Sequence, residues 1–183
     1  MQKNIVVLTG RPGVGKTTLF QRIVSILKQN GLKVHGFVCP EVRREGARIG
    51  FRIRSIDGLI EGWLARVDSC FDGPRIGKYH VCREAEEVAR QAISKALREA
   101  DVIAIDEIGP MELRLIGIRS SIIDAVKSGK PGVYVAHARL NDPVILPILR
   151  ERGNWFRITI ENRDSIYYDI IRALKRILGN RLP

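Results

Sequence analysis

Apolar residues along the chain follow two alternating patterns. Short continuous apolar runs are typical of strands buried on both faces, whereas apolar residues that recur every three or four positions are typical of helices. The runs predict strands at 4–9, 34–38, 102–105, 133–136 and 155–160. The helical spacing predicts helices at 19–28, 83–100, 116–127, 143–152 and 164–178. This alternation favours an α/β fold in which a mainly parallel central sheet has helices on both faces.

Residues 41–82 interrupt the alternation. Apolar residues from Phe51 onward alternate with arginines, Asp57-Gly58 is a turn signal, and residues 59–64 supply a returning strand. We therefore predict a β-hairpin insertion with loops at about 41–82. No linker, repeat or low-complexity tract divides the chain, so residues 1–183 are expected to form a single P-loop domain.

The segment between the first strand and the first helix carries the clearest chemistry. It consists of Gly10, Arg11, Pro12, Gly13, Val14, Gly15, Lys16 and Thr17. This octapeptide matches G-x-x-x-x-G-K-[ST], in which glycines let the backbone N–H groups curl around phosphates. Lys16 is expected to reach the outer phosphates and act in catalysis, and the Thr17 hydroxyl to ligate Mg²⁺. Together with Thr18, the segment is the predicted nucleotide-binding loop.

A second acidic motif follows the apolar run at 102–105. Asp106 is positioned to hold Mg²⁺, and Glu107 to orient a water or accept its proton. Alone, such a run ending in Asp-Glu is more often a solvated acidic turn after a strand. Combined with a P-loop, it predicts nucleotide-triphosphate chemistry, with Asp106 and Glu107 also counted among the nucleotide-binding residues.

Charge leaves two interpretations open. The chain has 31 Lys+Arg against 20 Asp+Glu and a formal net charge of +11. Such a surplus attracts nucleic acid, or belongs to a charge-rich surface around an anion-binding mouth. Basic residues are scattered along the sequence and no stripe of basic residues interleaved with aromatic ones is evident, which favours the second interpretation.

Cysteine usage and hydropathy indicate the compartment. Cys39, Cys70 and Cys82 are odd in number and show no CxxC spacing, so we expect reduced, buried thiols and no zinc site. No apolar stretch approaches the length of a membrane span, and the N-terminus lacks a signal-peptide pattern. A cytoplasmic protein is expected.

Several further residues are candidates for the site. A cation that stabilises the γ-phosphate could come from an arginine after a predicted strand or on a nearby loop, namely Arg43, Arg44, Arg139 or Arg163. For each of them a solvated surface position is the competing interpretation. His137 ends a predicted strand and could sense phosphate or sit in the core. Trp63 and Trp155 are interpreted as packing residues.

Segments in a fixed order resemble one family. They are Gly10–Thr18, Gly36–Val38, Glu41–Arg43, Gly50-Phe51, Gly77–Val81, Asp106–Leu113 and Glu161–Asp164. The chain resembles the thermophilic nucleoside-triphosphatases, also called cancer-related nucleoside-triphosphatases. The resemblance implies a single-domain P-loop protein that uses Mg²⁺ to hydrolyse several ribonucleoside triphosphates to diphosphate and phosphate. It also implies nucleotide binding at 10–17 and 102–109. Many members carry lysine where this chain has Pro110, which leaves the turnover rate in question.

Two alternatives stay open beside hydrolysis. A nucleotide or small-molecule kinase would transfer phosphate to an added acceptor. A nucleotide-gated, nucleic-acid-binding regulator would turn over slowly and bind DNA or RNA in a salt-dependent way. Glu107 favours a hydrolase, because a hydrolase needs a carboxylate that positions water.

Overall fold

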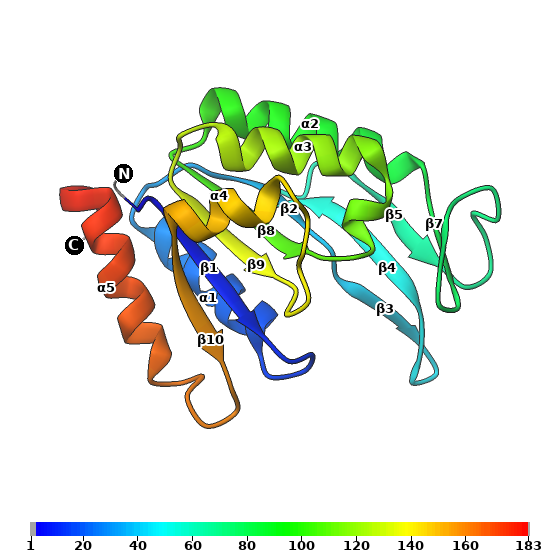
Figure 1. Cartoon of the computed structure of the whole chain (residues 1–183), viewed down its shortest axis with the longest axis horizontal. Coiled ribbons are helices and arrows are strands. Elements are labelled where there is room, and N and C mark those ends of the chain that lie inside the picture. Colours follow the sequence, from blue (N-terminus) through cyan, green and yellow to red (C-terminus); the bar gives the residue numbers. More distant parts are fainter. Residues whose placement is uncertain (1–2, 183) are drawn as a thin grey trace.

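The computed structural model describes residues 3–182, which form one ten-stranded sheet (Figure 1). The strand order is β10-β1-β9-β8-β2-β4-β5-β7-β6, and β3 pairs with β4 outside this order. The five strands at one end are parallel: β10 (Gly153–Ile158), β1 (Ile5–Gly10), β9 (Gly132–Ala136), β8 (Val102–Ile108) and β2 (Val34–Val38). This arrangement confirms the predicted α/β fold with a mainly parallel core.

Five α-helices cover the parallel strands on both faces, as predicted (Figure 1). They are α1 (Lys16–Gln29), α2 (Glu84–Glu99), α3 (Ile116–Lys127), α4 (Ile145–Arg152) and α5 (Ile166–Leu178). Helices α2, α3 and α4 lie on one face, and α1 and α5 lie on the other. Two short 3-10 turns, η1 (Glu112–Arg114) and η2 (Gly179–Arg181), follow β8 and α5.

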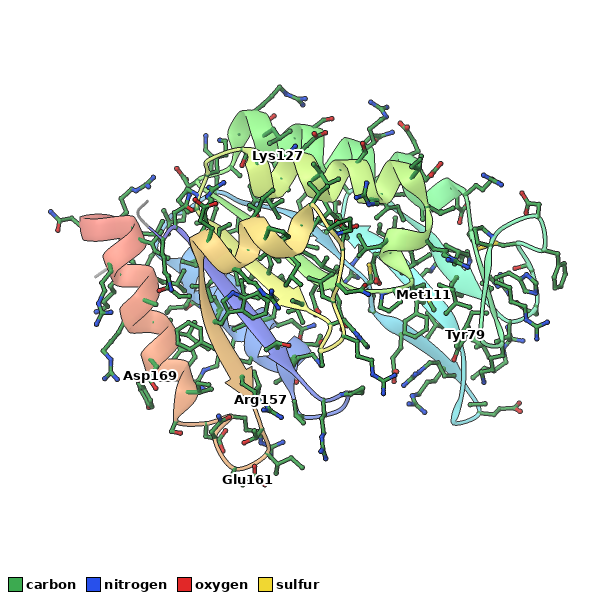
Figure 2. The ribbon with its side chains drawn as sticks, viewed as in Figure 1. Tyr79, Met111, Lys127, Arg157, Glu161 and Asp169 are labelled. Atoms are coloured by element: carbon green, nitrogen blue, oxygen red, sulfur yellow. A yellow bond between two sulfur atoms is a disulfide. The ribbon has the colours of Figure 1, made fainter. Side chains whose placement is uncertain are left out.

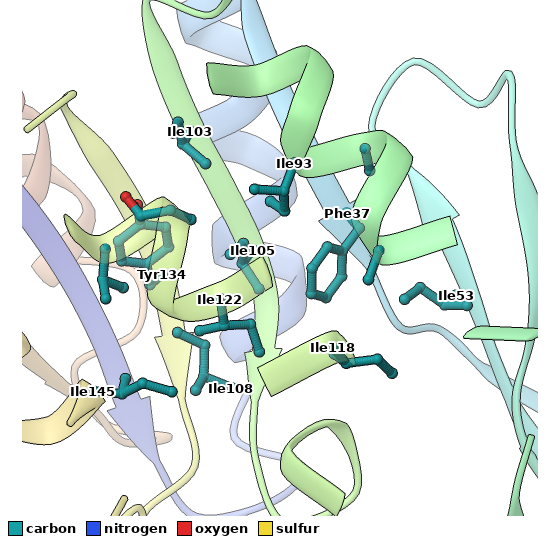
Figure 3. Packing of buried hydrophobic residues seen from close by; sticks show 14 of the residues in the cluster. Phe37, Ile53, Ile93, Ile103, Ile105, Ile108, Ile118, Ile122, Tyr134 and Ile145 are labelled. Carbon is teal, nitrogen blue, oxygen red and sulfur yellow. The ribbon is translucent and has the colours of Figure 1, made fainter. Parts of the chain in front are cut away.

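Alternation of side chains along the strands builds two separate cores. On the face of α2, α3 and α4, Ile103 and Ile105 of β8 meet Ile93 and Ile122, and Tyr134 is fully buried beside them (Figure 3). On the opposite face, neighbouring strand positions contact α1 and α5. Because successive strand residues point to opposite faces, an uninterrupted apolar strand is what a sheet covered on both sides requires.

The insertion at 41–82 continues the central sheet instead of forming a separate hairpin. Its strands are β3 (Glu41–Arg44), β4 (Ala47–Ser55), β5 (Glu61–Arg66), β6 (Arg75–Ile76) and β7 (Tyr79–Val81). Strand β4 pairs antiparallel with β2, so backbone hydrogen bonds join the insertion to the parallel strands. The hairpin of β4 and β5 was predicted, whereas β3, β6 and β7 were not, because each is four residues or shorter and lacks a clear apolar run.

The expectation of three reduced cysteines is wrong for two of them. Cys70 and Cys82 form a disulfide with Cα atoms 5.1 Å apart, which ties the segment after β5 to the start of α2. Cys39 is the free thiol. Burial, and then the negative charges of Glu112 and Asp106, raise its pKa well above the usual value, so the Cys39 thiol is inert.

Element boundaries differ from the predictions in a way that matters at the sheet edge. Strand β8 extends three residues beyond the predicted 102–105, so Asp106 and Glu107 lie inside the strand and not in a following turn. Strand β10 begins and ends two residues earlier than predicted, and α4 and α5 begin two residues later. The predicted bounds of α3 are confirmed.

Candidate nucleotide-binding site

The P-loop lies at the carboxyl edge of the sheet, between the end of β1 and the start of α1. Its glycines take backbone angles that L side chains rarely adopt, with φ of 152° at Gly10 and 102° at Gly15. A Cβ atom on Gly10 would stand 2.4 Å from the carbonyl oxygen of Ile158, so only glycine fits between β1 and β10. Val14 packs into the core between the sheet and α1 and α5.

Lys16 is buried at the base of this loop. Its Nζ donates hydrogen bonds of 3.1 and 3.0 Å to the carbonyl oxygens of Gly10 and Arg11. These bonds hold the ammonium group beneath the loop, where the N-terminus of α1 adds positive potential. Arg11, Pro12, Gly13, Thr17 and Thr18 are exposed, so the loop and the first turn of α1 are accessible to a ligand.

Asp106 and Thr17 meet across the sheet edge. The Thr17 hydroxyl and the Asp106 carboxylate lie close enough for Thr17 to lower the pKa of Asp106, although 89 positions separate the two residues in the sequence. Burial raises the pKa of Asp106 to about 6, while the Thr17 hydrogen bond and the charge of Lys16 oppose that rise. A hydroxyl and a carboxylate oxygen brought together in this way are the hard donors that Mg²⁺ selects.

Glu107 occupies an irregular point in β8. The pairing with β9 shifts between Asp106 and Ile108, so Glu107 is the extra residue of a bulge, and the Asp106–Glu107 peptide is cis. Burial raises the pKa of its carboxyl group, and the Lys16 ammonium lowers it. A bulge redirects a side chain that regular alternation would send to the core face, and here Glu107 comes within electrostatic range of Lys16.

Glu112 is a buried carboxyl group that residue-by-residue reasoning missed. It is 6% exposed on η1, and a Cβ on Gly109 would lie 3.0 Å from Glu112 Oε2 and 3.3 Å from Glu107 Oε1. Burial, reinforced by the charges of Glu107 and Asp106, raises its pKa to about 8. Its only signal in the sequence was its place in the 106–113 segment shared with the family. Figure 2 shows the neighbouring Met111 just beyond β8.

The loop after β9 brings His137 and Arg139 to the same edge. His137 Cβ lies 3.4 Å from the position of a Cβ on Gly109, and its Nδ1 accepts a 3.1 Å hydrogen bond from the Arg139 N–H. Burial, and then the charges of Lys16 and Arg139, lower the pKa of His137. These effects favour the neutral form of the His137 imidazole.

Of the four candidate arginines, Arg163 lies next to the P-loop. Its Cδ lies 3.7 Å from the position of a Cβ on Gly15, and it has no ion-pair partner among residues 3–182. The Asn162 side chain braces the turn by accepting from the Thr159 N–H and donating to the Arg157 carbonyl. Figure 2 shows Arg157 and Glu161 on this side of the molecule.

Arg43 and Arg44 are not brought to the site. Both belong to β3, which pairs with β4 in the antiparallel part of the sheet (Figure 1). Arg43 donates to Glu41 and to the Gly46 carbonyl within that hairpin. Both arginines are exposed, in agreement with the interpretation that they are solvated surface residues.

Protein groups alone do not complete a metal site. Within the described part of the chain, no cluster of three or more His, Cys, Asp or Glu residues could hold a metal ion. None of the described helices is long and apolar enough to cross a membrane.

Comparison with known proteins points to one family. A family model described as NTPase matches residues 5–171. Nucleoside-triphosphatase THEP1 of Hyperthermus butylicus is 54% identical over 175 residues, which cover 95% of this chain and 92% of that protein. The corresponding protein of Methanopyrus kandleri is 39% identical, with coverages of 96% and 98%.

Solved structures agree with the sequence relatives. The crystal structure of THEP1 from the hyperthermophile Aquifex aeolicus superposes with a TM-score of 0.78 at 34% identity, covering 94% of this chain and 99% of that one. The solution structure of a human cancer-related nucleoside triphosphatase gives a TM-score of 0.74 at 33% identity, with coverages of 96% and 98%. The resemblance drawn from the sequence is confirmed, and the chain belongs to the THEP1 family of nucleoside-triphosphatases.

Proposed function

We propose that this chain hydrolyses nucleoside triphosphates, ATP and GTP among them, to diphosphate and phosphate. The observation that carries the proposal is the pairing of Lys16 beneath the P-loop with the Glu107 carboxyl group nearby. A P-loop alone accounts for phosphate binding. A carboxylate within electrostatic range of the phosphate-binding lysine adds the group that hydrolysis requires.

The P-loop residues 10–18 bind the triphosphate. Backbone N–H groups of the loop and the first turn of α1 donate to the phosphate oxygens, and Lys16 neutralises charge on the outer phosphates. We assign Arg163 to the phosphates as well, because it lies over Gly15 without a competing carboxylate in the described structure. Arg139, which follows His137, is the second cation that could reach the γ-phosphate.

Thr17 and Asp106 would hold Mg²⁺. The Thr17 hydroxyl and the Asp106 carboxylate already interact, and burial of Asp106 raises its pKa to about 6. When bound, the ion screens the phosphate oxygens and withdraws charge from the bond that breaks.

Glu107 would orient the attacking water in line with the bond to the γ-phosphate and accept its proton. His137 and Glu112 lie beside Gly109, as Glu107 does. Exclusion of water strengthens every electrostatic interaction at the site.

Phosphate release from each of four ribonucleoside triphosphates with Mg²⁺ tests the proposal. We expect Glu107→Gln to lower kcat by two orders of magnitude or more, in the range typical of lost general-base catalysis, with little change in nucleotide affinity. Glu151→Gln, an exposed glutamate on α4, is the matched control and should retain wild-type kcat. Equal rates in wild type and Glu107→Gln would contradict the assigned role. Undiminished hydrolysis by Lys16→Ala would contradict the whole site.

A nucleotide or small-molecule kinase activity is the alternative to hydrolysis. Pro110, exposed three residues beyond Glu107, bears on the turnover rate, because the family resemblance implies a lysine at this position in many members. Phosphate transfer to added nucleosides or nucleotides, faster than phosphate release to water, would favour the kinase over the hydrolase.

We further propose a cytoplasmic location, where nucleoside triphosphates are available. The Cys70–Cys82 disulfide is compatible with that location, since intracellular proteins of hyperthermophiles are often rich in disulfides. The relative from Aquifex aeolicus comes from a hyperthermophile.

A further inference from the structure

The outer strands of the sheet leave one face uncovered. Strands β4 and β5 bury Ile53 and Leu64 against α2 on one side. On the other side lie α1 and α5, yet the core that these helices form contains no buried residue of β4 or β5 within the described chain. The face of β4 and β5 opposite α2 is therefore open, and we call it the open face.

Arginines and one tryptophan gather on the open face. Arg52 and Arg54 alternate with the buried Ile53 on β4, and Trp63 is the cross-strand partner of Arg52 on β5. A Cβ on Gly50 would lie 3.1 Å from Trp63 Cζ3, so the indole extends across β4 where no side chain obstructs it. Arginines that are scattered along the sequence thus gather around Trp63 in the folded chain, in a cluster that the order of residues in the sequence does not reveal.

The indole and two guanidinium groups are stacked together. The guanidinium carbons of Arg52 and Arg66 lie 4.4 and 4.3 Å from the centre of the Trp63 ring. Acidic neighbours are present as well: Glu61 is 3.4 Å from Arg52, and Asp68 is 2.8 Å from Arg66. The Arg66–Asp68 pair is bidentate, at 2.8 and 2.9 Å, whereas Arg52 and Glu61 make a single contact, and both pairs orient a guanidinium plane beside the indole.

A groove of about 450 Å³ continues from the open face toward α1. Arg54 and Lys28 line it, and neither has a carboxylate within ion-pair distance among residues 3–182. Lys28 donates to the Ile56 carbonyl, and Asp57, the acidic residue of the groove, is bound to Lys95 at 2.8 Å. The groove thus offers two cations that no described acidic side chain neutralises.

The groove also lies close to the nucleotide site. Val38 lines it at the end of β2, and the next residue, Cys39, donates its N–H to the carbonyl oxygen of Asp106 at 2.6 Å. Phe20 and Gln21, on the first turns of α1 after the P-loop, line the same groove. A ligand here would lie along the helix whose N-terminus binds the triphosphate.

We propose that the open face and its groove bind single-stranded nucleic acid. Backbone phosphates contact four cationic side chains: Arg54, Lys28 and the edges of Arg52 and Arg66. An unstacked base adds to the stack that Arg52, Trp63 and Arg66 form. A single strand is the occupant because its bases are free to stack on aromatic and guanidinium planes, whereas bases within a duplex are not. The proposal does not depend on hydrolysis, and its test reads binding alone.

Binding is measured with a fluorescein-labelled 20-nucleotide oligouridylate over 50 to 300 mM KCl, by anisotropy. Four cations predict a slope of about −3 for log affinity against log salt, since each phosphate contact on a single strand contributes about −0.7. The double substitution Arg54→Gln/Arg66→Gln should weaken binding and reduce the slope to about −1.5. Arg172→Gln/Arg176→Gln removes the same charge from exposed positions on α5 and should leave both unchanged.

Trp63 supplies the second readout. In a Trp155→Phe protein, whose remaining tryptophan is Trp63, the oligonucleotide should quench emission. Trp63→Leu should weaken oligouridylate binding about tenfold or more while heparin binding persists, because stacking and charge are separate contributions. Thermal melts verify that each variant is folded.

Three results would overturn the proposal. They are no oligonucleotide binding at 50 mM KCl, an equal loss of affinity in the α5 control, or heparin binding as tight as oligouridylate with unchanged Trp63 emission. The last result would assign the face to polyanions in general. ATP hydrolysis measured in the same samples distinguishes a failure here from a failure of the proposed enzyme.

Discussion

At the scale of single residues, three carboxyl groups at the site are buried with few positive charges near them. Asp106, Glu107 and Glu112 crowd the carboxyl edge of β8, and burial raises the pKa of all three. The positive charge of Lys16 opposes the rise in pKa at Asp106 and at Glu107. Bound Mg²⁺ would lower the pKa of Asp106, which is a proposed ligand of the ion. The raised pKa of Glu112 instead bears on the stability of the fold.

Glu112 makes stability depend on pH. Its pKa is about 8 in the folded protein and about 4.3 in an unfolded chain, so the folded state retains a proton that the unfolded state has lost between those values. This contribution to stability is fully present below pH 4.3 and is lost as pH rises to about 8. Relative to Glu112→Gln, the wild type should lose on the order of 4 kcal/mol of unfolding free energy across that window.

Urea unfolding of both proteins at pH 4.5 and 8.5 measures this difference. Glu99→Gln, an exposed position on α2, should show no such change relative to wild type. Parallel pH profiles for wild type and Glu112→Gln would show that Glu112 does not hold its proton in the folded state.

At the scale of elements, the weakest part of the fold is the segment between β5 and α2. Strands β6 and β7 contain two and three residues, and β6 pairs with β7 alone. So few backbone hydrogen bonds make a marginal ladder in water. The Cys70–Cys82 disulfide joins the two ends of this segment, so it restricts the unfolded chain where the folded chain has least packing.

Removing the disulfide should lower thermal stability. A loop of this length corresponds to about 3 kcal/mol, or roughly 6 to 12 °C in Tm for a domain of this size. The double variant Cys70→Ser/Cys82→Ala should melt lower than wild type, and dithiothreitol should lower the wild-type Tm without affecting the variant. Cys39→Ala is the control, and its Tm should respond to dithiothreitol as the wild-type Tm does. A wild-type Tm unaffected by dithiothreitol would mean that the bond contributes nothing.

At the scale of the whole molecule, the sequence predicted the parts that local pattern determines. The parallel strands and the covering helices were predicted because their apolar periodicity reflects burial on both faces. The P-loop was predicted because one short segment contains all its chemistry. The continuation of the sheet through β4 was not, since pairing between β2 and β4 depends on long-range backbone contacts that no local pattern records.

Residues brought together from distant segments were the least predictable. Arg163 over Gly15 and the Cys70–Cys82 bond each need the folded chain to be recognised. Glu112 looked like an ordinary polar residue because its burial comes from the turn after β8 and not from its neighbours in sequence. Trp63 was interpreted as a packing residue because the arginines that stack on it are three and eleven positions away.

The disulfide also closes part of the chain into a covalent ring. Phe71, 68% exposed, lies inside this ring and is a site that chymotrypsin can attack. A cut there would leave two fragments linked, so the nicked protein would migrate at full length until a reductant separated them. Damage to the outer strands would therefore go unseen on a non-reducing gel, and the cut molecule could keep its P-loop, β8 and nucleotide site in one piece.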